Sequence, residues 1–175
     1  MPSFENKLSE VVTRYIPGCT ELIAVERLSG GASQETYRLT LAIDGQEVLM
    51  AMRRSPGGEF VEPVAARPGL DVEAMLMRAA KAEGVPEPEV YYLLSREDDL
   101  GDGFIMQWLE GEALGARIVR SPDYKAVRPG LARECGRILA RIHQIDLDRT
   151  ALKERLTTIP PEAFLDQMLE RYYLL

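Results

Sequence analysis

Two glycines and a serine are the first residues of this sequence whose types and spacing suit chemistry. Gly30 and Gly31 follow a short apolar run, and Ser33 comes two residues later. A glycine pair lets the backbone approach a ligand closely, so the N–H groups and the Ser33 hydroxyl would suit phosphate oxygens. The alternative is an ordinary hairpin turn, because the spacing is not G-x-G-x-x-G and glycine pairs are common in turns.

Histidine and asparagine are nearly absent, which removes several kinds of site. The chain has one histidine, His143, and one asparagine, Asn6. A His-rich metal site and a catalytic asparagine in the middle of the chain are therefore excluded. Cys19 and Cys135 form no C-x-x-C motif, so we expect two reduced thiols in a reducing compartment.

Length and charge limit the function further. The 175 residues, 46% of them apolar, are enough for a hydrophobic core without disulfides or metals. The formal net charge of -7 repels phosphate backbones and anionic lipid headgroups, so neither nucleic acid nor a membrane is expected as a partner. No apolar stretch has the length of a signal-peptide core or a membrane span, and we expect a cytoplasmic protein.

The first hundred residues predict mostly strands around one internal helix. A helix with Ser3 as its N-cap is expected over 2–15, and apolar spacing predicts the internal helix over 71–83. The pair Asp44 and Gly45 stands between two alternating apolar runs, which is a strong hairpin signal. The expected strands cover 21–28, 37–43, 48–53, 90–94 and 104–109.

After Gly111 the pattern becomes helical. Apolar residues recur along one face of 131–145 and along one face of 164–172, and both helices are expected to bury that face. The chain is apolar to its last residue, Leu175, without the polar fraying usual at a domain end. We therefore expect that whatever covers this end is missing from the chain.

Five segments together resemble the aminoglycoside-phosphotransferase-like family of small-molecule kinases, and their order and spacing match along residues 20–145. They are LSGGAS (28–33), LMAMRRSP (49–56), VPEP (85–88), FIMQWLEG (104–111) and LARIH (139–143). The resemblance implies an α+β fold: a protein-kinase-like small lobe, with a five-stranded antiparallel sheet and one helix, followed by the first helices of the large lobe. The nucleotide-binding small lobe with its N-terminal helix would span 1–109. The hinge and an incomplete large lobe would span 110–175.

The resemblance assigns the phosphate contacts. In kinase-like enzymes a cation at the end of the third strand holds the α- and β-phosphates of ATP, and a carboxylate of the next helix holds the cation. Arg53 is the implied cation and Glu73 the implied carboxylate, in a bidentate pair that would hold the guanidinium rigidly. Glu73 is alternatively a helix-N-terminal acid favoured by the helix dipole. Arg54 points to the opposite face and is expected to be solvated.

The resemblance also assigns the remaining nucleotide contacts. The adenine ring would bind main-chain groups of Gln107, Trp108 and Leu109 at the hinge between the lobes. Leu28 or Val25 would lie above the ring, and Trp108 alternatively packs at the lobe junction. The loop over the triphosphate would be formed by Gly30, Gly31 and Ser33.

The catalytic loop of this fold is absent from the sequence. Phosphoryl transfer needs an Asp as base, an Asn for Mg²⁺ and a second metal-binding Asp. In the family that the chain resembles, the first two look like His-Gly-Asp followed by Asn, whereas His143 precedes Gln144 and Asn6 precedes the first strand. The resemblance therefore implies ATP and Mg²⁺ as cofactors, with no catalytic residue and no metal ligand in this chain. His143 is expected to be a structural residue at a helix end.

Two functions are expected. As a family member the protein would be an ATP-dependent phosphotransferase acting on a small hydroxylated molecule, although this chain alone would be inactive. The alternative is a non-catalytic kinase-like module that associates with a partner or a second copy through its apolar C-terminal helices. The sequence does not identify the acceptor substrate: a sugar, an amino alcohol, an antibiotic and an acyl carrier are all compatible with it. The net charge gives only a slight preference for a cationic acceptor.

Overall fold

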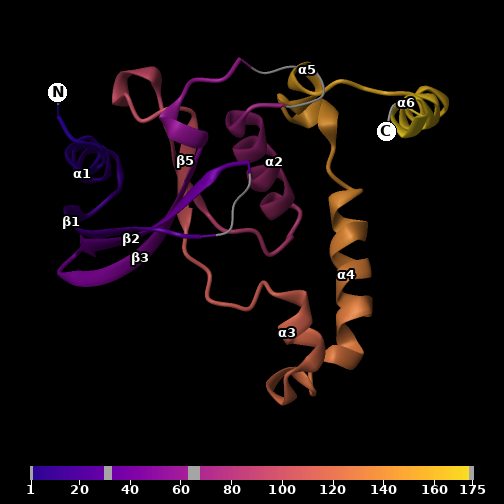
Figure 1. The fold of residues 1–175 in the computed structure, drawn as a ribbon, viewed down its shortest axis with the longest axis horizontal. Helices are drawn as coiled ribbons and strands as arrows, with labels where there is room; N and C mark the ends of the chain where they lie inside the picture. Colours follow the sequence, from indigo (N-terminus) through magenta and orange to yellow (C-terminus); the bar gives the residue numbers. More distant parts are fainter. Residues whose placement is uncertain (1, 30–32, 63–67, 174–175) are drawn as a thin grey trace.

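The structure, a computed structural model, describes residues 2–29, 33–62 and 68–173. Five antiparallel strands form one sheet in the order β1-β2-β3-β5-β4, with helix α1 on one face and helix α2 on the other (Figure 1). The expected five-stranded antiparallel sheet with helices is confirmed. The bounds are α1 (Phe4–Tyr15), β1 (Cys19–Arg27), β2 (Glu35–Ile43), β3 (Gln46–Arg54), α2 (Leu70–Ala82), β4 (Val90–Leu93) and β5 (Gly103–Gln107).

Helix α1 covers the face of the sheet that carries Tyr37, Leu39 and Leu41. Ser3 is its N-cap, as expected, because the Ser3 hydroxyl accepts a hydrogen bond from the backbone N–H of Asn6 at 3.2 Å. The apolar stripe of the helix completes a continuous core with the sheet. That core includes Leu8, Val11, Val12, Ile16, Met50, Met52 and Ile105.

The β2–β3 hairpin fixes which side chains share a face. Asp44 and Gly45 at its turn have φ angles of 50° and 76°, the left-handed values that a tight two-residue hairpin turn requires, so the hairpin prediction is confirmed. The register places Glu35 opposite Arg54. Because successive side chains alternate between faces, Arg54 lies on the α1 face and Arg53 on the α2 face.

Helix α2 packs on the opposite face, over β4 and β5. Its Leu70 and Ala74 form a small core with Val90 and Phe104. Phe104 is completely buried there, and it pairs with Arg53 across β3 and β5. The second core therefore lies beside Arg53.

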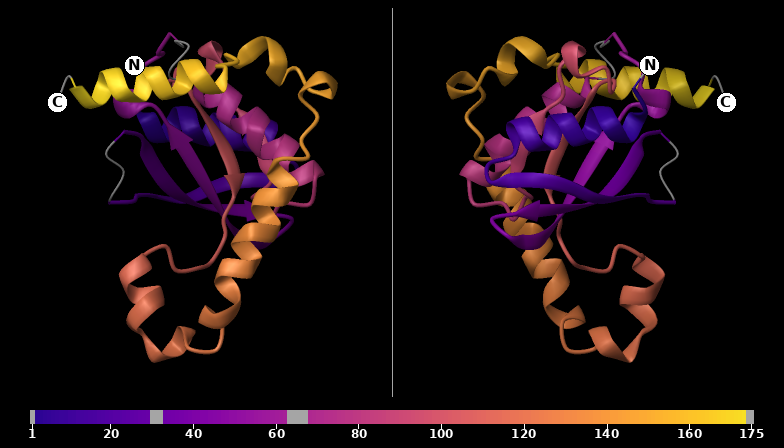
Figure 2. Two further views of the ribbon diagram at one scale, coloured as in Figure 1. Left: turned by 90° about the vertical axis from the view of Figure 1, so that its right-hand side faces the viewer. Right: turned by 90° about the vertical axis from the view of Figure 1, so that its left-hand side faces the viewer.

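The chain leaves the sheet two residues earlier than expected, because β5 ends at Gln107. Four helices follow, and Figures 1 and 2 show α4 extending from α3 toward α5 on the α2 side of the sheet. Their bounds are α3 (Gly115–Arg120), α4 (Arg128–Ile142), α5 (Leu152–Arg155) and α6 (Pro161–Tyr173).

These later helices are exposed where the sequence predicted buried faces. Beyond residue 109, Leu152 is the only buried residue in the described part of the chain. Leu139 of α4 is 51% exposed and Phe164 of α6 is 55% exposed. The prediction of buried faces over 131–145 and 164–172 is therefore wrong for the described residues, since helical spacing identifies an apolar face but not its partner. None of the described helices has the length and apolar character needed to cross a membrane.

Candidate nucleotide site

Arg53 and Glu73 form an ion pair on the α2 face of the sheet. Arg53 lies near the end of β3, and Glu73 lies in the first turn of α2. The Arg53 Nη1 is 2.6 Å from the Glu73 Oε1, and the two side chains are 38% and 33% exposed. The structure thus brings together the two residues that the resemblance paired, at a partly open position where the guanidinium is accessible.

The guanidinium of Arg53 is divided between two acceptors. Its Nε donates to the Oε1 of Gln34, so the expected bidentate pair with Glu73 is not formed. Two bonds in different directions fix the plane of the guanidinium, and its Nη2 has no hydrogen-bond partner among the described residues. Sequence reasoning missed Gln34. The signal was the strand period, which places Gln34 on the same face as Arg53.

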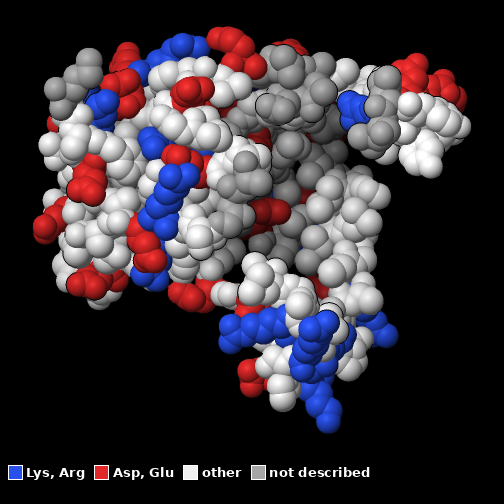
Figure 3. All heavy atoms as spheres, in the orientation of Figure 1, with Lys and Arg blue, Asp and Glu red and all other residues white. Residues whose placement is uncertain are grey.

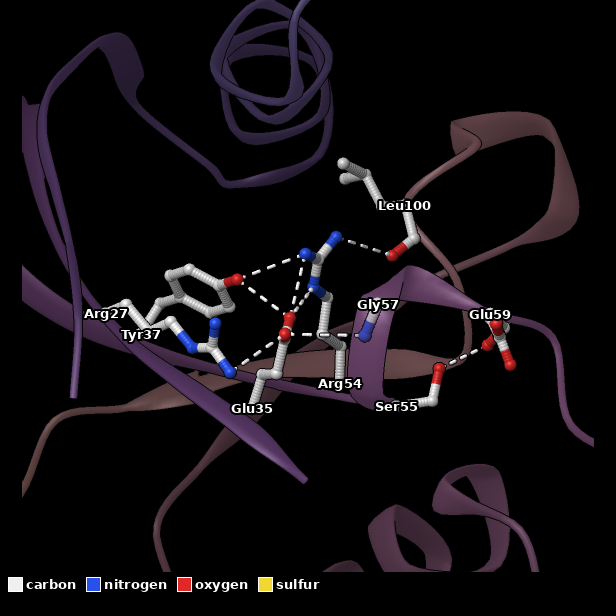
Figure 4. Close-up of polar contacts among 8 residues, drawn as sticks. All are labelled: Arg27, Glu35, Tyr37, Arg54, Ser55, Gly57, Glu59 and Leu100. Atoms are coloured by element: carbon white, nitrogen blue, oxygen red, sulfur yellow. Dashed lines mark hydrogen bonds and ion pairs between the residues drawn. The ribbon is translucent and has the colours of Figure 1, made fainter. Parts of the chain in front are cut away.

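A second polar cluster, built around a buried carboxylate, occupies the α1 face of the same strands (Figure 4). Glu35 is 8% exposed, and its Oε2 accepts hydrogen bonds from the Tyr37 hydroxyl at 2.8 Å and from the Arg54 Nε at 2.9 Å. Arg27 Nη2 lies 3.0 Å from the Glu35 Oε1, and the Gly57 N–H donates to the same oxygen at 3.4 Å. The cluster ties the start of β2 to the end of β3.

Arg54 is 12% exposed, so the prediction that it is solvated is wrong. Its guanidinium lies 4.4 Å from the centre of the Phe4 ring, and its Nη1 donates to the carbonyl of Leu100 at 3.2 Å. Helix α1 and the segment around Leu100 cover this face, a long-range arrangement that strand alternation does not reveal. The missed signal is Glu35, a charged residue on the same strand face as Leu39.

The buried Glu35 carboxylate should make the free energy of unfolding depend on pH. Burial raises the pKa of this carboxyl, but hydrogen bonds from Tyr37, Arg54 and Gly57 outweigh it, so the pKa is lowered in the folded state. The stabilisation is complete above the unfolded pKa of about 4.3 and is lost as pH falls through the lower folded value. Urea unfolding should show the largest difference between wild type and Glu35→Gln near pH 7, and a smaller one below about pH 4. A difference independent of pH would contradict this assignment.

The segment after β5 offers main-chain groups to a ligand. Gln107 donates its N–H to the Glu89 carbonyl at 2.7 Å and so still belongs to the sheet. Leu109 lies beyond it, 52% exposed, and its peptide groups make no backbone hydrogen bond among the described residues. Trp108 is half-buried, with its Nε1 donating to the Glu110 Oε1 at 2.6 Å. Among the described residues, the peptide groups of Leu109 are therefore available to a ligand.

The remaining predicted contacts are only partly described. Gly30 and Gly31 lie outside the described residues, and Ser33 lines a cavity of about 170 Å³ beside the start of α2. Leu28 is half-buried just after β1. Val25 is also half-buried, and its side chain packs against the core under α1.

Helix α2 is held near both ends by arginines from the later helices. Arg155 of α5 forms an ion pair with Asp71 in the first turn of α2, and Arg141 of α4 donates to the Gly84 carbonyl just past its last turn. Leu152 of α5 is 1% exposed, and α5 contacts α2 directly. The helix that carries Glu73 is therefore held near both ends by helices that follow β5.

The described residues do not fit a metal site. No group of three or more His, Cys, Asp or Glu side chains among them could hold a metal ion. His143 ends α4 as its C-cap, with an exposed side chain, and Asn6 lies on α1. Cys19 at the start of β1 is buried, and Cys135 on α4 is exposed; both are free thiols.

One protein-family model matches most of this chain. The sequence model of the "Phosphotransferase enzyme family" matches residues 24–174, which is most of the chain. The match includes the sheet, both residues of the Arg53–Glu73 pair and the later helices. No curated protein matches this chain.

Proposed function

The chain belongs to the phosphotransferase enzyme family, and on that premise we propose that it is the nucleotide-binding part of a cytoplasmic, ATP-dependent kinase for a small hydroxylated molecule. The observation that carries the proposal is the ion pair between Arg53 and Glu73, at 2.6 Å on the α2 face of the sheet. In kinase-like enzymes a cation held in this way binds the α- and β-phosphates of ATP.

Arg53 has the free hydrogen-bonding capacity that this role needs. Gln34 and Glu73 occupy its Nε and Nη1, and among the described residues Nη2 has no partner and would bind a phosphate oxygen. A guanidinium whose plane is already fixed loses less freedom on binding than a mobile one. At the other end of the nucleotide, the exposed peptide groups of Leu109 would bind the adenine edge, and Leu28 would cover the ring.

Phosphoryl transfer is not proposed for this chain alone. The single asparagine, Asn6, and the single histidine, His143, leave it without the Asp and Asn of the catalytic loop. Since the described residues also lack a group that fits Mg²⁺, metal coordination forms no part of the proposal. We expect phosphate release from MgATP to stay at background with this chain.

Nucleotide binding by calorimetric titration tests the proposal. Replacing Arg53 with glutamine should weaken ATP binding at least tenfold, because it removes a charge-assisted hydrogen bond of about 1.5–3 kcal/mol. Glu73→Gln should weaken binding less, since the cation remains. The matched control is Arg38→Gln on β2, which removes an exposed charge paired with Glu26. Equal affinities of wild type and Arg53→Gln, or no ATP binding by wild type, would contradict the proposal.

A second candidate function is a non-catalytic module that pairs with a second copy of the chain. The apolar residues of α6 favour it, because they are between 45% and 79% exposed among the described residues. They are Phe164, Leu165, Met168, Leu169, Tyr172 and Tyr173. Sedimentation at micromolar and tenfold lower concentration distinguishes the two functions, because a dimer that dissociates on dilution supports association and a monomer at both concentrations contradicts it.

A further inference from the structure

Charge is distributed very unevenly along this acidic chain. Residues 1–109 contain eighteen acidic and ten basic residues, whereas residues 115–141 contain two acidic and seven basic residues. Those seven lie on α3, α4 and the turn between them. Figure 3 shows the result as a group of Lys and Arg side chains over α3 and the adjoining end of α4. The negative net charge of -7 therefore comes from residues 1–109, and the surface of α3 and α4 is positively charged.

Several of these cations have no acidic partner among the described residues. Arg120, Lys125 and Arg133 are exposed and form no ion pair there. Arg128 is half-buried and donates only to two carbonyls, those of Val119 and Ser121, so its charge is not neutralised. We call Arg120, Lys125, Arg128 and Arg133 the basic patch. These four charges, on α3, α4 and the turn between them, have no acidic partner among the described residues and would attract an anion.

The charge of the rest of the chain limits the size of that anion. An extended polyanion, such as a nucleic acid or an anionic membrane, would also meet the net negative sheet. A small anion needs to contact only the basic patch. The patch lies on α3, α4 and the turn between them, the helical part of the chain that follows β5 (Figure 1). On the proposed function, this helical part is where the acceptor would bind.

We propose that the basic patch binds the anionic group of the acceptor, a phosphate or a similar multiply charged group carried away from the hydroxyl that is phosphorylated. This proposal rests on the proposed function, because only a kinase has an acceptor. It reverses the slight preference for a cationic acceptor that the net charge of the chain suggested. Exposed Val119 and Val127, at 63% and 52%, adjoin the patch and would contact an apolar part of the same molecule. The acceptor class is thus a hydroxylated compound with an anionic head.

Inorganic pyrophosphate is the probe for this site, and amide shifts in nuclear magnetic resonance locate where it binds. The titration is made on the Arg53→Gln variant as well as on wild type, which separates the basic patch from the proposed phosphate contact. In both proteins pyrophosphate should shift amides of α3 and α4, with an affinity that falls as salt rises. A triple variant, Arg120→Gln with Lys125→Gln and Arg133→Gln, should bind roughly tenfold more weakly. Arg128 is kept because it holds α3 to α4.

The matched control removes the same charge elsewhere, with Arg14→Gln, Arg96→Gln and Arg149→Gln, all at exposed positions. It should bind pyrophosphate as wild type does. The proposal is overturned if the control loses affinity as much as the patch variant, if pyrophosphate shifts no amide of α3 or α4, or if only anionic vesicles bind there. ATP titration of wild type gives a separate answer, so a failure of the nucleotide proposal is distinguishable from a failure at the patch.

Discussion

Replacing Glu35 with glutamine should lower the free energy of unfolding by about 3–4 kcal/mol, because it leaves a buried cation without its counter-charge. Arg54 is 12% exposed and Glu35 is 8% exposed, so water cannot take over the lost interaction. The Tyr37 hydroxyl, which donates to the same carboxylate at 2.8 Å, loses part of its bond as well. Urea unfolding at neutral pH measures the change from the shift of the transition midpoint.

Glu26→Gln is the control for this prediction, because Glu26 also pairs with an arginine but at an exposed position. Its partner Arg38 lies across β1 and β2, with side-chain exposures of 57% for Glu26 and 44% for Arg38. An exposed pair contributes about 0–1 kcal/mol, so this variant should unfold close to wild type. Similar losses in the two variants would show that burial of the Glu35 cluster does not set its contribution.

Truncating Phe104 to alanine should cost about 3–5 kcal/mol of stability and should also weaken nucleotide binding. Phe104 is completely buried between β5 and α2, where it contacts the core of Leu70, Ala74 and Val90. The cavity left by the ring would release α2 from the sheet and with it the Glu73 carboxylate. Thermal or urea unfolding measures the first effect, and ATP titration of the folded variant measures the second.

Two comparisons make the Phe104 prediction specific. Phe104→Leu removes less volume and should cost less than half as much, whereas Tyr91→Ala on β4 truncates a ring that is 43% exposed and should cost about 1 kcal/mol or less. If Phe104→Ala destabilised the protein but left ATP affinity unchanged, the position of α2 would not govern the nucleotide site. Equal stabilities of Phe104→Ala and Tyr91→Ala would contradict the core assignment itself.

Local patterns predicted the elements of the sheet well, because each depends on neighbouring residues. The turn at Asp44 and Gly45 is one case, since two residues at positive φ are what an Asp-Gly turn provides. The N-cap at Ser3 is another. The pairing of Arg53 with Glu73, in contrast, was predicted from the family resemblance, and its role in nucleotide binding remains a proposal.

Features that depend on long-range packing were not predictable. The burial of Arg54 requires α1 to cross the face on which it lies, and no residue near Arg54 in the sequence encodes that crossing. Gln34 was overlooked because strand alternation places it on the face of Arg53 without showing that the two side chains meet. For α6, the amphipathic period gave the direction of the apolar face but not whether another part of the chain covers it.

The docking of α5 on α2 couples the helices that follow β5 to the proposed nucleotide site. Asp71, which binds Arg155, and Glu73, which binds Arg53, share the first turn of α2. Any displacement of that turn moves both carboxylates together. By thermodynamic linkage, a nucleotide that fixes Glu73 must favour the docked position of α5 by the same free energy with which α5 favours the nucleotide. The bound nucleotide and the docked α5 would thus stabilise each other through α2 without contact between them.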